Sequence, residues 1–490
     1  MWNLIRKRPQ TIVSRWDLSR AIMQLTRSDT WTIGDACQGC QILGTTGSGK
    51  STGSLSAIIG AFLLSGFGGI FFTSKPSDCA TYLQLCEIAG RGKDVMIFGP
   101  NQPYRFNALD AELHRSDAGS GQNQSIVTLL TTLLEVNERV GTSFNSEGYW
   151  QNATEQLIRN GVDALVMGKD RCSVPELFKV VTSAPTSFEQ LASPEWCKNS
   201  YCCQCLREAD ARTKDPVKRR DLELTASYFL NEFPALSDRT RSCIVSMFTS
   251  MADVLNRGLI RELISDESNI SPEMMQHGKI IIVDLPTFLF GSAGTFLQVL
   301  WKYCTQRAQE RRDIAANPRP VFMVADESHH FAVKQDQIFQ TTARSTRTAV
   351  VCATQSISNY LAMFGEHSES LVHSLLGNLS TQIFHQQTDI KTNTYAADLI
   401  GRTKQLMINA NSSYQPGNWF ESLLDVGNNQ TVSSGVNEVY EYEVQPSVFN
   451  SLRKGGAPLW TADAIVYQGG RQFSQTGRPW TPVTFKQQLF

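Results

Sequence analysis

The chain has 490 residues, of which 41% are hydrophobic and 19% are charged, a composition that is ordinary for a soluble globular protein with more than one domain. The formal net charge of −1 neither supports nor excludes a nucleic-acid partner, because such binding needs only local basic loops. Twelve cysteines without a secretory signal predict reduced cytosolic thiols, and argue against the disulfide framework of a secreted protein.

Residues 1–29 form a basic N-terminal arm in which apolar side chains are interleaved with cations. This arm can dock onto a partner protein, a nucleic acid or a membrane surface. It can equally be a solvated segment that packs its aromatic side chains on the following domain. The cations are Arg6, Lys7, Arg8, Arg15, Arg20 and Arg27.

A phosphate-binding pattern follows the first apolar strand. Residues 40–52 read as a short strand, then Gly44-x-x-x-x-Gly49-Lys50-Ser51, then the start of a helix, which is the P-loop pattern. Its glycines let successive N–H groups face an anion, and the helix N-terminus adds partial positive charge. Lys50 would reach the β- and γ-phosphates of ATP, and Ser51 would bind Mg²⁺. The predicted nucleotide-binding residues are Gly44, Thr45, Thr46, Gly47, Ser48, Gly49, Lys50, Ser51 and Thr52.

Strands and helices alternate through the rest of this region. Strands are predicted within residues 30–43, 70–73 and 95–98, and helices over 54–65 and 78–89. This alternation predicts a parallel sheet with right-handed crossovers. The longest uncharged run, residues 51–74, is interpreted as part of this buried core, and no membrane span is predicted.

Strands disappear between residues 117 and 276, which we interpret as an all-helical insertion domain. Apolar residues recur at helical spacing over 126–140, 150–164, 222–230 and 241–264. The basic run 214–220 also contains and adjoins acids. A solvated helix face or loop is the default interpretation there, and a contact with DNA or a partner is the alternative.

Two groups of cysteines invite a zinc interpretation. One consists of Cys197, Cys202, Cys203 and Cys205 in the insertion. Neighbouring cysteines cannot easily both bind one tetrahedral ion, so a zinc site is not predicted. The Cys37 and Cys40 pair leads into the P-loop strand and is interpreted as incidental.

Strands return at residue 279. A strand over 280–283 ends at Asp284, and a long helix follows with one apolar face over 297–308. Further strands cover 321–325 and 349–354. Loops rich in glycine and asparagine are predicted near 409–417 and 427–435. The sheet domain therefore comprises residues 30–116 and 277–490, divided in sequence by the helical insertion.

A P-loop ATPase also needs a carboxylate for Mg²⁺ and a base that orients the attacking water. Asp326 is assigned to the metal, together with Ser51, and Glu327 is assigned to the water, because only this strand ends in two carboxylates. Asp284 is interpreted as a strand-end cap or turn residue, since Leu285 and Pro286 steer the chain away. His329 and His330 are interpreted as structural or substrate-facing.

Three other polar residues lie near these positions in the sequence. Gln355 ends the next strand, where an amide can sense the γ-phosphate; the alternative is an ordinary strand-end hydrogen bond. Arg344 and Arg347 lie between the carboxylates and this strand. Either can stabilise phosphoryl charge in a neighbouring subunit, or be a surface cation.

These motifs together resemble the TraG/TraD-type coupling ATPases of conjugation and type IV secretion, in the FtsK–HerA branch of P-loop ATPases. The resemblance covers nearly the whole chain. It implies an α/β fold, with a RecA-like domain whose sheet is mainly parallel plus the all-α insertion, and a homo-hexameric ring with nucleotide sites between subunits. It also favours Arg344 over Arg347 as the arginine acting in trans. The motifs that carry the resemblance are the P-loop, Val324-Ala-Asp-Glu327, Ala343-Arg-x-x-Arg347, Ala353-Thr-Gln-Ser356, Phe106-Asn-x-Leu109, Tyr149-Trp-x-x-Ala153, Ile282-Val-Asp-Leu-Pro286, Phe449-x-x-Leu452 and Gly455-Gly456.

Two features depart from this family pattern. Coupling ATPases usually begin with membrane-spanning helices, and none is predicted here. Family members often carry Asp-x-Lys after the second strand, whereas Thr73-Ser-Lys75 keeps only the lysine. Any contribution of the missing aspartate must therefore come from elsewhere or be absent.

The leading hypothesis is a cytoplasmic, Mg²⁺-dependent ATPase, placed peripherally at the inner membrane when it works with a secretion channel. It would move single-stranded DNA, or a relaxase–DNA complex, towards the channel subunits of a type IV secretion system. Two alternatives stay open. One is a soluble HerA-like DNA pump in DNA processing or defence. The other is a receptor whose helical insertion binds secreted proteins.

Overall fold

The computed structural model describes residues 14–115, 123–140, 148–265, 267–365, 368–413 and 431–487. Within them, the centre of the molecule is a nine-stranded sheet with strand order β13-β12-β9-β3-β8-β7-β4-β6-β5. The strands from β3 to β9 are parallel, and β12 and β13 are added antiparallel at one edge. The mainly parallel α/β sheet predicted from the sequence is thus confirmed. The strands are β3 (Cys40–Leu43), β4 (Gly68–Phe72), β5 (Val95–Phe98), β6 (Ile280–Val283), β7 (Val321–Ala325), β8 (Thr348–Thr354), β9 (Thr381–Phe384), β12 (Thr461–Gln468) and β13 (Trp480–Lys486).

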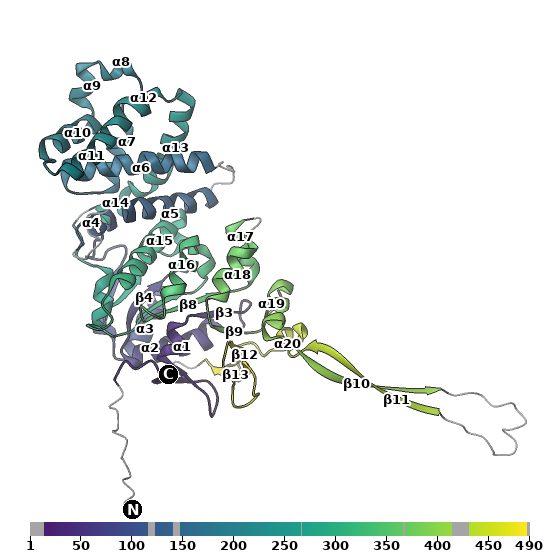
Figure 1. Cartoon of the computed structure of the whole chain (residues 1–490). Coiled ribbons are helices and arrows are strands. Elements are labelled where there is room, and N and C mark those ends of the chain that lie inside the picture. Colours follow the sequence, from purple (N-terminus) through teal and green to yellow (C-terminus); the bar gives the residue numbers. More distant parts are fainter. Residues whose placement is uncertain are drawn as a thin grey trace, which may run out of the picture.

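Helices cover both faces of this sheet (Figure 1). The parallel strands are apolar along nearly their whole length because both faces are buried. Alternate residues therefore belong to two cores: Phe72 faces the core that contains helix α15, and Phe71 faces the core that contains helix α2. The helices of this domain are α1 (Ile33–Cys37), α2 (Ser56–Ser65), α3 (Asp78–Ile88), α15 (Thr287–Arg311), α16 (Lys334–Thr342), α17 (Ile357–Phe364), α18 (Glu369–Gly377), α19 (Ile390–Ile400) and α20 (Pro446–Ser451).

Between β5 and β6 the described chain is helical, and these helices form the separate group at the top of Figure 1. The periodic stretch 241–264 forms two helices and not one, with a 90° bend between them. Among the described residues, no single helix is long and apolar enough to cross a membrane; only this bent pair passes such a test together. The helices are α4 (Ala108–Leu113), α5 (Gln124–Val140), α6 (Gly148–Lys169), α7 (Val174–Thr182), α8 (Phe188–Leu191), α9 (Pro194–Asn199), α10 (Tyr201–Arg212), α11 (Pro216–Ser227), α12 (Phe233–Ala235), α13 (Asp238–Leu255) and α14 (Gly258–Ser265).

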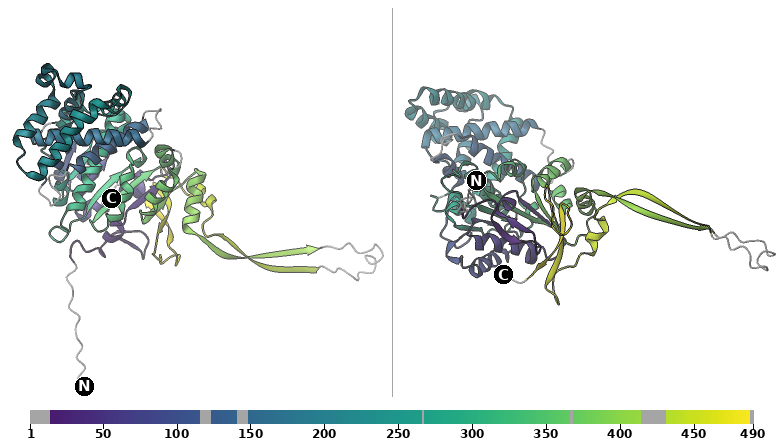
Figure 2. Two further views of the ribbon diagram at one scale, coloured as in Figure 1. Left: turned by 45° about the horizontal axis from the view of Figure 1, so that its top comes forward. Right: turned by 60° about the horizontal axis from the view of Figure 1, so that its bottom comes forward.

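A two-stranded arm projects from the sheet domain near α19 and α20, and both views of Figure 2 show it extending away from the body. It consists of β10 (Arg402–Ser413) paired with β11 (Thr431–Tyr442). The predicted loops at 409–417 and 427–435 were therefore wrong for 409–413 and 431–435, while 414–430 lies outside the described residues. Antiparallel pairing uses backbone groups alone, so it tolerates asparagine, serine and glycine, residues that favour loops.

The described part of the basic N-terminal arm packs on the sheet domain. Its strand β1 (Ala21–Gln24) pairs with β2 (Thr30–Thr32), and the ring of Trp16 lies 6.2 Å from that of Phe67. The Trp16 carbonyl accepts a hydrogen bond from Arg347. Residues 14–29 therefore agree with the interpretation of a segment that packs its aromatic side chains on the following domain. Residues 1–13 lie outside the described part of the chain.

Candidate functional site

The predicted P-loop follows the carboxyl end of β3, which lies between β8 and β9 in the sheet. The ends of all three strands meet here, and the Thr45 N–H donates to the Gln386 carbonyl at 3.0 Å. Gly49 has φ +90°, and a Cβ atom on it would lie 2.4 Å from the Ala462 Cβ. Both the backbone angle and this close approach require glycine. Residues just beyond such strand ends form the usual ligand site of a parallel sheet.

The proposed metal ligands lie next to each other although they are far apart in sequence. The Ser51 hydroxyl donates a 2.7 Å hydrogen bond to Oδ2 of Asp326, which follows β7. Hydroxyl and carboxylate oxygens are hard ligands of the kind that Mg²⁺ prefers. The buried Ser48 hydroxyl has no hydrogen-bond partner among the described residues. These oxygens and the P-loop N–H groups therefore suit a magnesium–nucleoside triphosphate.

Glu327 lies at the centre of the site and is only 3% exposed. Its Oε1 is 3.4 Å from both Lys50 Nζ and Lys75 Nζ, and it accepts a 3.5 Å hydrogen bond from Gln355. Burial acts to raise the pKa of Glu327, but Lys50, Lys75 and Gln355 act against it, and the net pKa is lowered. The carboxyl group is therefore ionised at neutral pH.

The other oxygen of Glu327, Oε2, lies 3.9 Å from Nδ1 of the neutral His329, beyond hydrogen-bonding distance. Oε2 is buried and has no hydrogen-bond partner among the residues that the structure describes. The backbone of Glu327 is left-handed, at φ 49° and ψ 42°, a conformation that costs about 1 kcal/mol for a residue with a side chain. An ionised oxygen without a hydrogen-bond partner, held by a strained turn, suits a base that orients water.

Lys75 is a site residue that the predicted set does not include. It follows β4, a neighbour of β7, and its ammonium group also lies 3.7 Å from Asp326. Asp78 orders this turn, because its Oδ2 accepts the N–H groups of Ser74 and Lys75, both at 2.8 Å. Asp78 thus supplies a carboxylate close to the position where the family pattern has aspartate. The signal in the sequence was a lysine three residues after the end of a buried strand.

The two candidate arginines differ in their surroundings. Arg347 donates hydrogen bonds to the carbonyls of Trp16 and Pro318, so it stabilises the packing within its own chain. Arg344 is exposed, its carbonyl accepts the Arg347 N–H at 3.1 Å, and its side chain makes no hydrogen bond or ion pair with the described residues. It precedes β8, whereas Gln355 follows β8, so the length of a seven-residue strand, roughly 20 Å, separates them. Arg344 is therefore not brought to the site of its own chain.

The contacts of Asp284, of His329 and of the cysteines in the insertion indicate structural roles. The Asp284 N–H donates to the Phe98 carbonyl at 2.8 Å, a strand-end role. Burial, with a smaller effect of His330, lowers the pKa of His329 to about 4, so this ring is neutral and bonds to Thr354 at 2.8 Å. The Cys197 and Cys203 sulfurs are 2.7 Å apart, and no group of three or more metal-binding side chains occurs in the described part of the chain.

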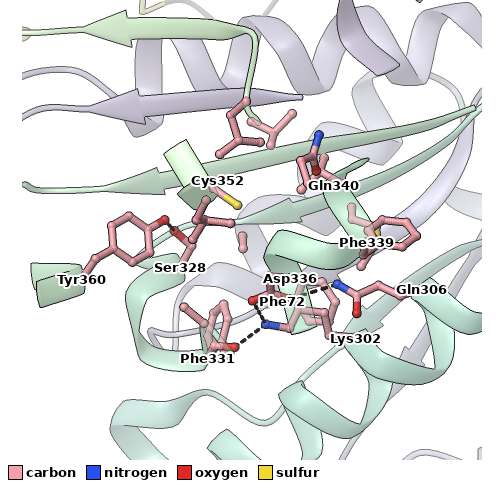
Figure 3. A pocket seen from close by; sticks show the side chains of 17 residues that line it. Phe72, Lys302, Gln306, Ser328, Phe331, Asp336, Phe339, Gln340, Cys352 and Tyr360 are labelled. Atoms are coloured by element: carbon pink, nitrogen blue, oxygen red, sulfur yellow. Dashed lines mark hydrogen bonds and ion pairs between the residues drawn. The ribbon is translucent and has the colours of Figure 1, made fainter. Parts of the chain in front are cut away.

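A buried polar cluster joins α15, α16 and the segment Ser328–Phe331, which follows Glu327 in the chain (Figure 3). Lys302 of α15 donates to the Phe331 carbonyl, and its Nζ is 2.6 Å from Oδ2 of Asp336. Gln306 donates to the other oxygen of Asp336 at 2.9 Å. Because Phe331 ends the short helix that begins after Glu327, this cluster holds that turn in place.

We expect Lys302→Met to lower the free energy of unfolding by about 3 kcal/mol, because it leaves a buried carboxylate without its cation. The measurement is urea denaturation followed by circular dichroism. The control is Lys334→Met, which removes an exposed ion pair with Glu135 at 3.8 Å and should change stability little. Equal stability of the two variants would contradict this assignment.

Part of the chain matches a known protein family. Residues 320–439 match the family model described as the TraM recognition site of TraD and TraG. A search of curated proteins finds no match. The match over residues 320–439 and the fold comparisons below confirm the resemblance to TraG/TraD-type coupling proteins.

Three solved structures share the fold. The unbound bacterial conjugative coupling protein TrwBdeltaN70 matches with 16% identity and a TM-score of 0.59, over 95% of this chain and 88% of that one. The plasmid coupling protein TrwB with ADP and Mg²⁺ matches with 14% identity and a TM-score of 0.57, over 96% and 90%. TrwB with the ATP analogue ADPNP matches with 17% identity and a TM-score of 0.58, over 93% and 86%.

Proposed function

We propose that this chain, a protein of the TraG/TraD type, is a Mg²⁺-dependent ATPase that moves single-stranded DNA or a relaxase–DNA complex towards a type IV secretion channel. The observation that carries the proposal is the ionised Glu327, whose Oε2 has no hydrogen-bond partner among the described residues, next to Lys50 and the Ser51–Asp326 pair. A scaffold that only binds nucleotide has no need of such a base. The nucleotide complexes of TrwB support the same choice of ligands.

Each residue of the site has a separate role in the proposed hydrolysis. When bound at Ser51 and Asp326, Mg²⁺ neutralises part of the phosphate charge. Lys50 binds the β- and γ-phosphates once its contact with Glu327 is exchanged for them. Glu327 Oε2 orients the attacking water and accepts its proton. Gln355 contacts Glu327, so it can transmit a change at the γ-phosphate to the end of β8.

We propose further that the active form is a homo-hexameric ring. The exposed Arg344, held away from its own site by the length of β8, supports a role in the site of a neighbouring subunit. The family model that matches residues 320–439 is named for recognition of TraM, and this range includes β10 and most of β11 of the projecting arm. Recognition of a relaxosome protein is therefore assigned to this part of the chain.

The test is the ATPase rate with and without single-stranded DNA across a salt series. We expect DNA of unrelated sequences to bind about equally and to raise the rate, because the ring grips backbone phosphates. If the site neutralises about four phosphates, the logarithm of the DNA-binding constant should fall with the logarithm of the salt concentration with a slope of roughly −3.

Lys50→Ala is the control, because it should remove hydrolysis and, since Lys50 is buried, leave the exposed surface of the chain unchanged. Neutralising the basic run 214–220 should alter loading more than the basal rate. No stimulation at low salt, combined with tight binding of a protein partner, would favour the receptor function instead.

A further inference from the structure

The two sides of the P-loop face different parts of the chain. On one side of β3, after β8, come the strands β7 and β4. Glu327 follows β7 and Lys75 follows β4, and these two residues define the γ-phosphate side of the site. On the other side lie β9, β12 and β13. A nucleotide that places its γ-phosphate beside Glu327 and its β-phosphate beside Lys50 and Ser51 must continue past the exposed Thr52. Its ribose and base then extend towards the segment that connects α20 to β12, and towards the end of β13.

The residue that follows β13 links the α20–β12 segment to the helical turn Ser51–Leu55, which directly follows Lys50 of the P-loop. Gln487, which follows β13, donates from Nε2 to the Thr52 hydroxyl at 2.5 Å, and its Oε1 accepts the Gly456 N–H at 2.5 Å. A Cβ atom on Gly455 would lie 2.3 Å from Gln487 Nε2, so glycine is required for this side chain to fit. Gln487 therefore lies beside Thr52, where the α-phosphate side of the nucleotide would begin.

Two large apolar side chains lie exposed at the same place. Leu459 is 62% exposed and Trp460 is 55% exposed. The Trp460 carbonyl accepts the Gln487 N–H at 2.8 Å, so Trp460 is one backbone contact away from the side chain that reaches Thr52. An exposed tryptophan at the mouth of a phosphate site offers a flat apolar surface, and every nucleobase can stack on such a surface.

We propose that residues 455–460 and Gln487 form the nucleoside subsite of the P-loop, with Trp460 stacking on the base and Gln487 bonding to the ribose or α-phosphate. The proposal rests on nucleotide binding at Lys50, part of the function proposed above. It adds a nucleoside-binding element from the C-terminal part of the chain to a site that the sequence placed only in residues 44–52. Because stacking does not read base edges, ATP and GTP should bind with similar affinity.

The test compares Mg²⁺–ATP with Mg²⁺–tripolyphosphate, which has no ribose or base, by isothermal titration calorimetry on the full chain. Trp460→Ala should weaken ATP binding about tenfold and leave tripolyphosphate binding unchanged. Trp460→Phe, which keeps an aromatic ring, should restore most of the ATP affinity. Gly455→Ala should also weaken ATP selectively, because it displaces Gln487 from Thr52.

Tyr440→Ala is the matched control, since Tyr440 is an exposed aromatic residue on the projecting arm and should affect neither ligand. Unchanged ATP affinity in Trp460→Ala would overturn the proposal, as would an equal loss for both ligands. Failure of the proposed function gives a different result: neither ligand would bind to the unaltered chain, and Lys50→Ala would then change nothing.

Discussion

Glu327→Gln is expected to bind ATP but to hydrolyse it at least about 100-fold more slowly, the usual effect of losing a general base. Glutamine keeps the shape of the side chain and can still lie beside Lys50 and Lys75. It cannot accept the proton of the attacking water. The measurement is phosphate release under saturating ATP, together with the dissociation constant of ATP for the same protein.

The pH profile gives a second measurement on the same residue. The lysines and Gln355 outweigh the effect of burial, and the pKa of Glu327 is below its ordinary value of 4.5. The base is therefore charged at neutral pH, and its activity should be lost only as the pH falls through this lowered pKa. Glu195→Gln, an exposed carboxylate of the helical insertion, is the control. Unchanged turnover in Glu327→Gln would remove the assignment of the base.

Arg344→Ala is expected to reduce hydrolysis by about 1,000-fold in a homogeneous ring, the scale of an arginine that stabilises charge on the transferred phosphoryl group. Its own chain folds without it, because the exposed side chain makes no hydrogen bond or ion pair with the described residues. ATP binding should persist. Arg261→Ala, at an exposed position in α14, should leave the rate unchanged.

Mixing distinguishes an action in trans from an action in cis. Rings of Lys50→Ala alone or Arg344→Ala alone should be inactive. Mixed rings should recover part of the activity, since some interfaces pair an intact Lys50 on one subunit with an intact Arg344 on its neighbour. Full activity of the homogeneous Arg344→Ala ring would move the role to Arg347 or abolish it. Arg347 is less suited, since it holds the carbonyls of Trp16 and Pro318.

Much of the candidate site could be predicted from local sequence, and the reason is physical. A P-loop needs glycines, a lysine and a hydroxyl within nine residues, so residues 44–52 reveal it without any distant contact. Asp326, Glu327 and Gln355 follow buried apolar strands, and parallel strands bring their carboxyl ends to one edge. The mainly parallel sheet follows from the same alternation of strands and helices.

Tertiary structure alone decided the contacts between distant segments. Lys75 reaches Glu327 across 252 positions, and Gln487 reaches Thr52 across 435 positions. Local periodicity carries no information about such pairs, because they depend on which strands become neighbours. The arm formed by β10 and β11 is similar: its pairing uses backbone groups, which every residue carries, so its polar sequence resembled a loop. By itself the sequence determined which residues are proposed to bind phosphate and to hydrolyse ATP, and only the fold decided what surrounds them.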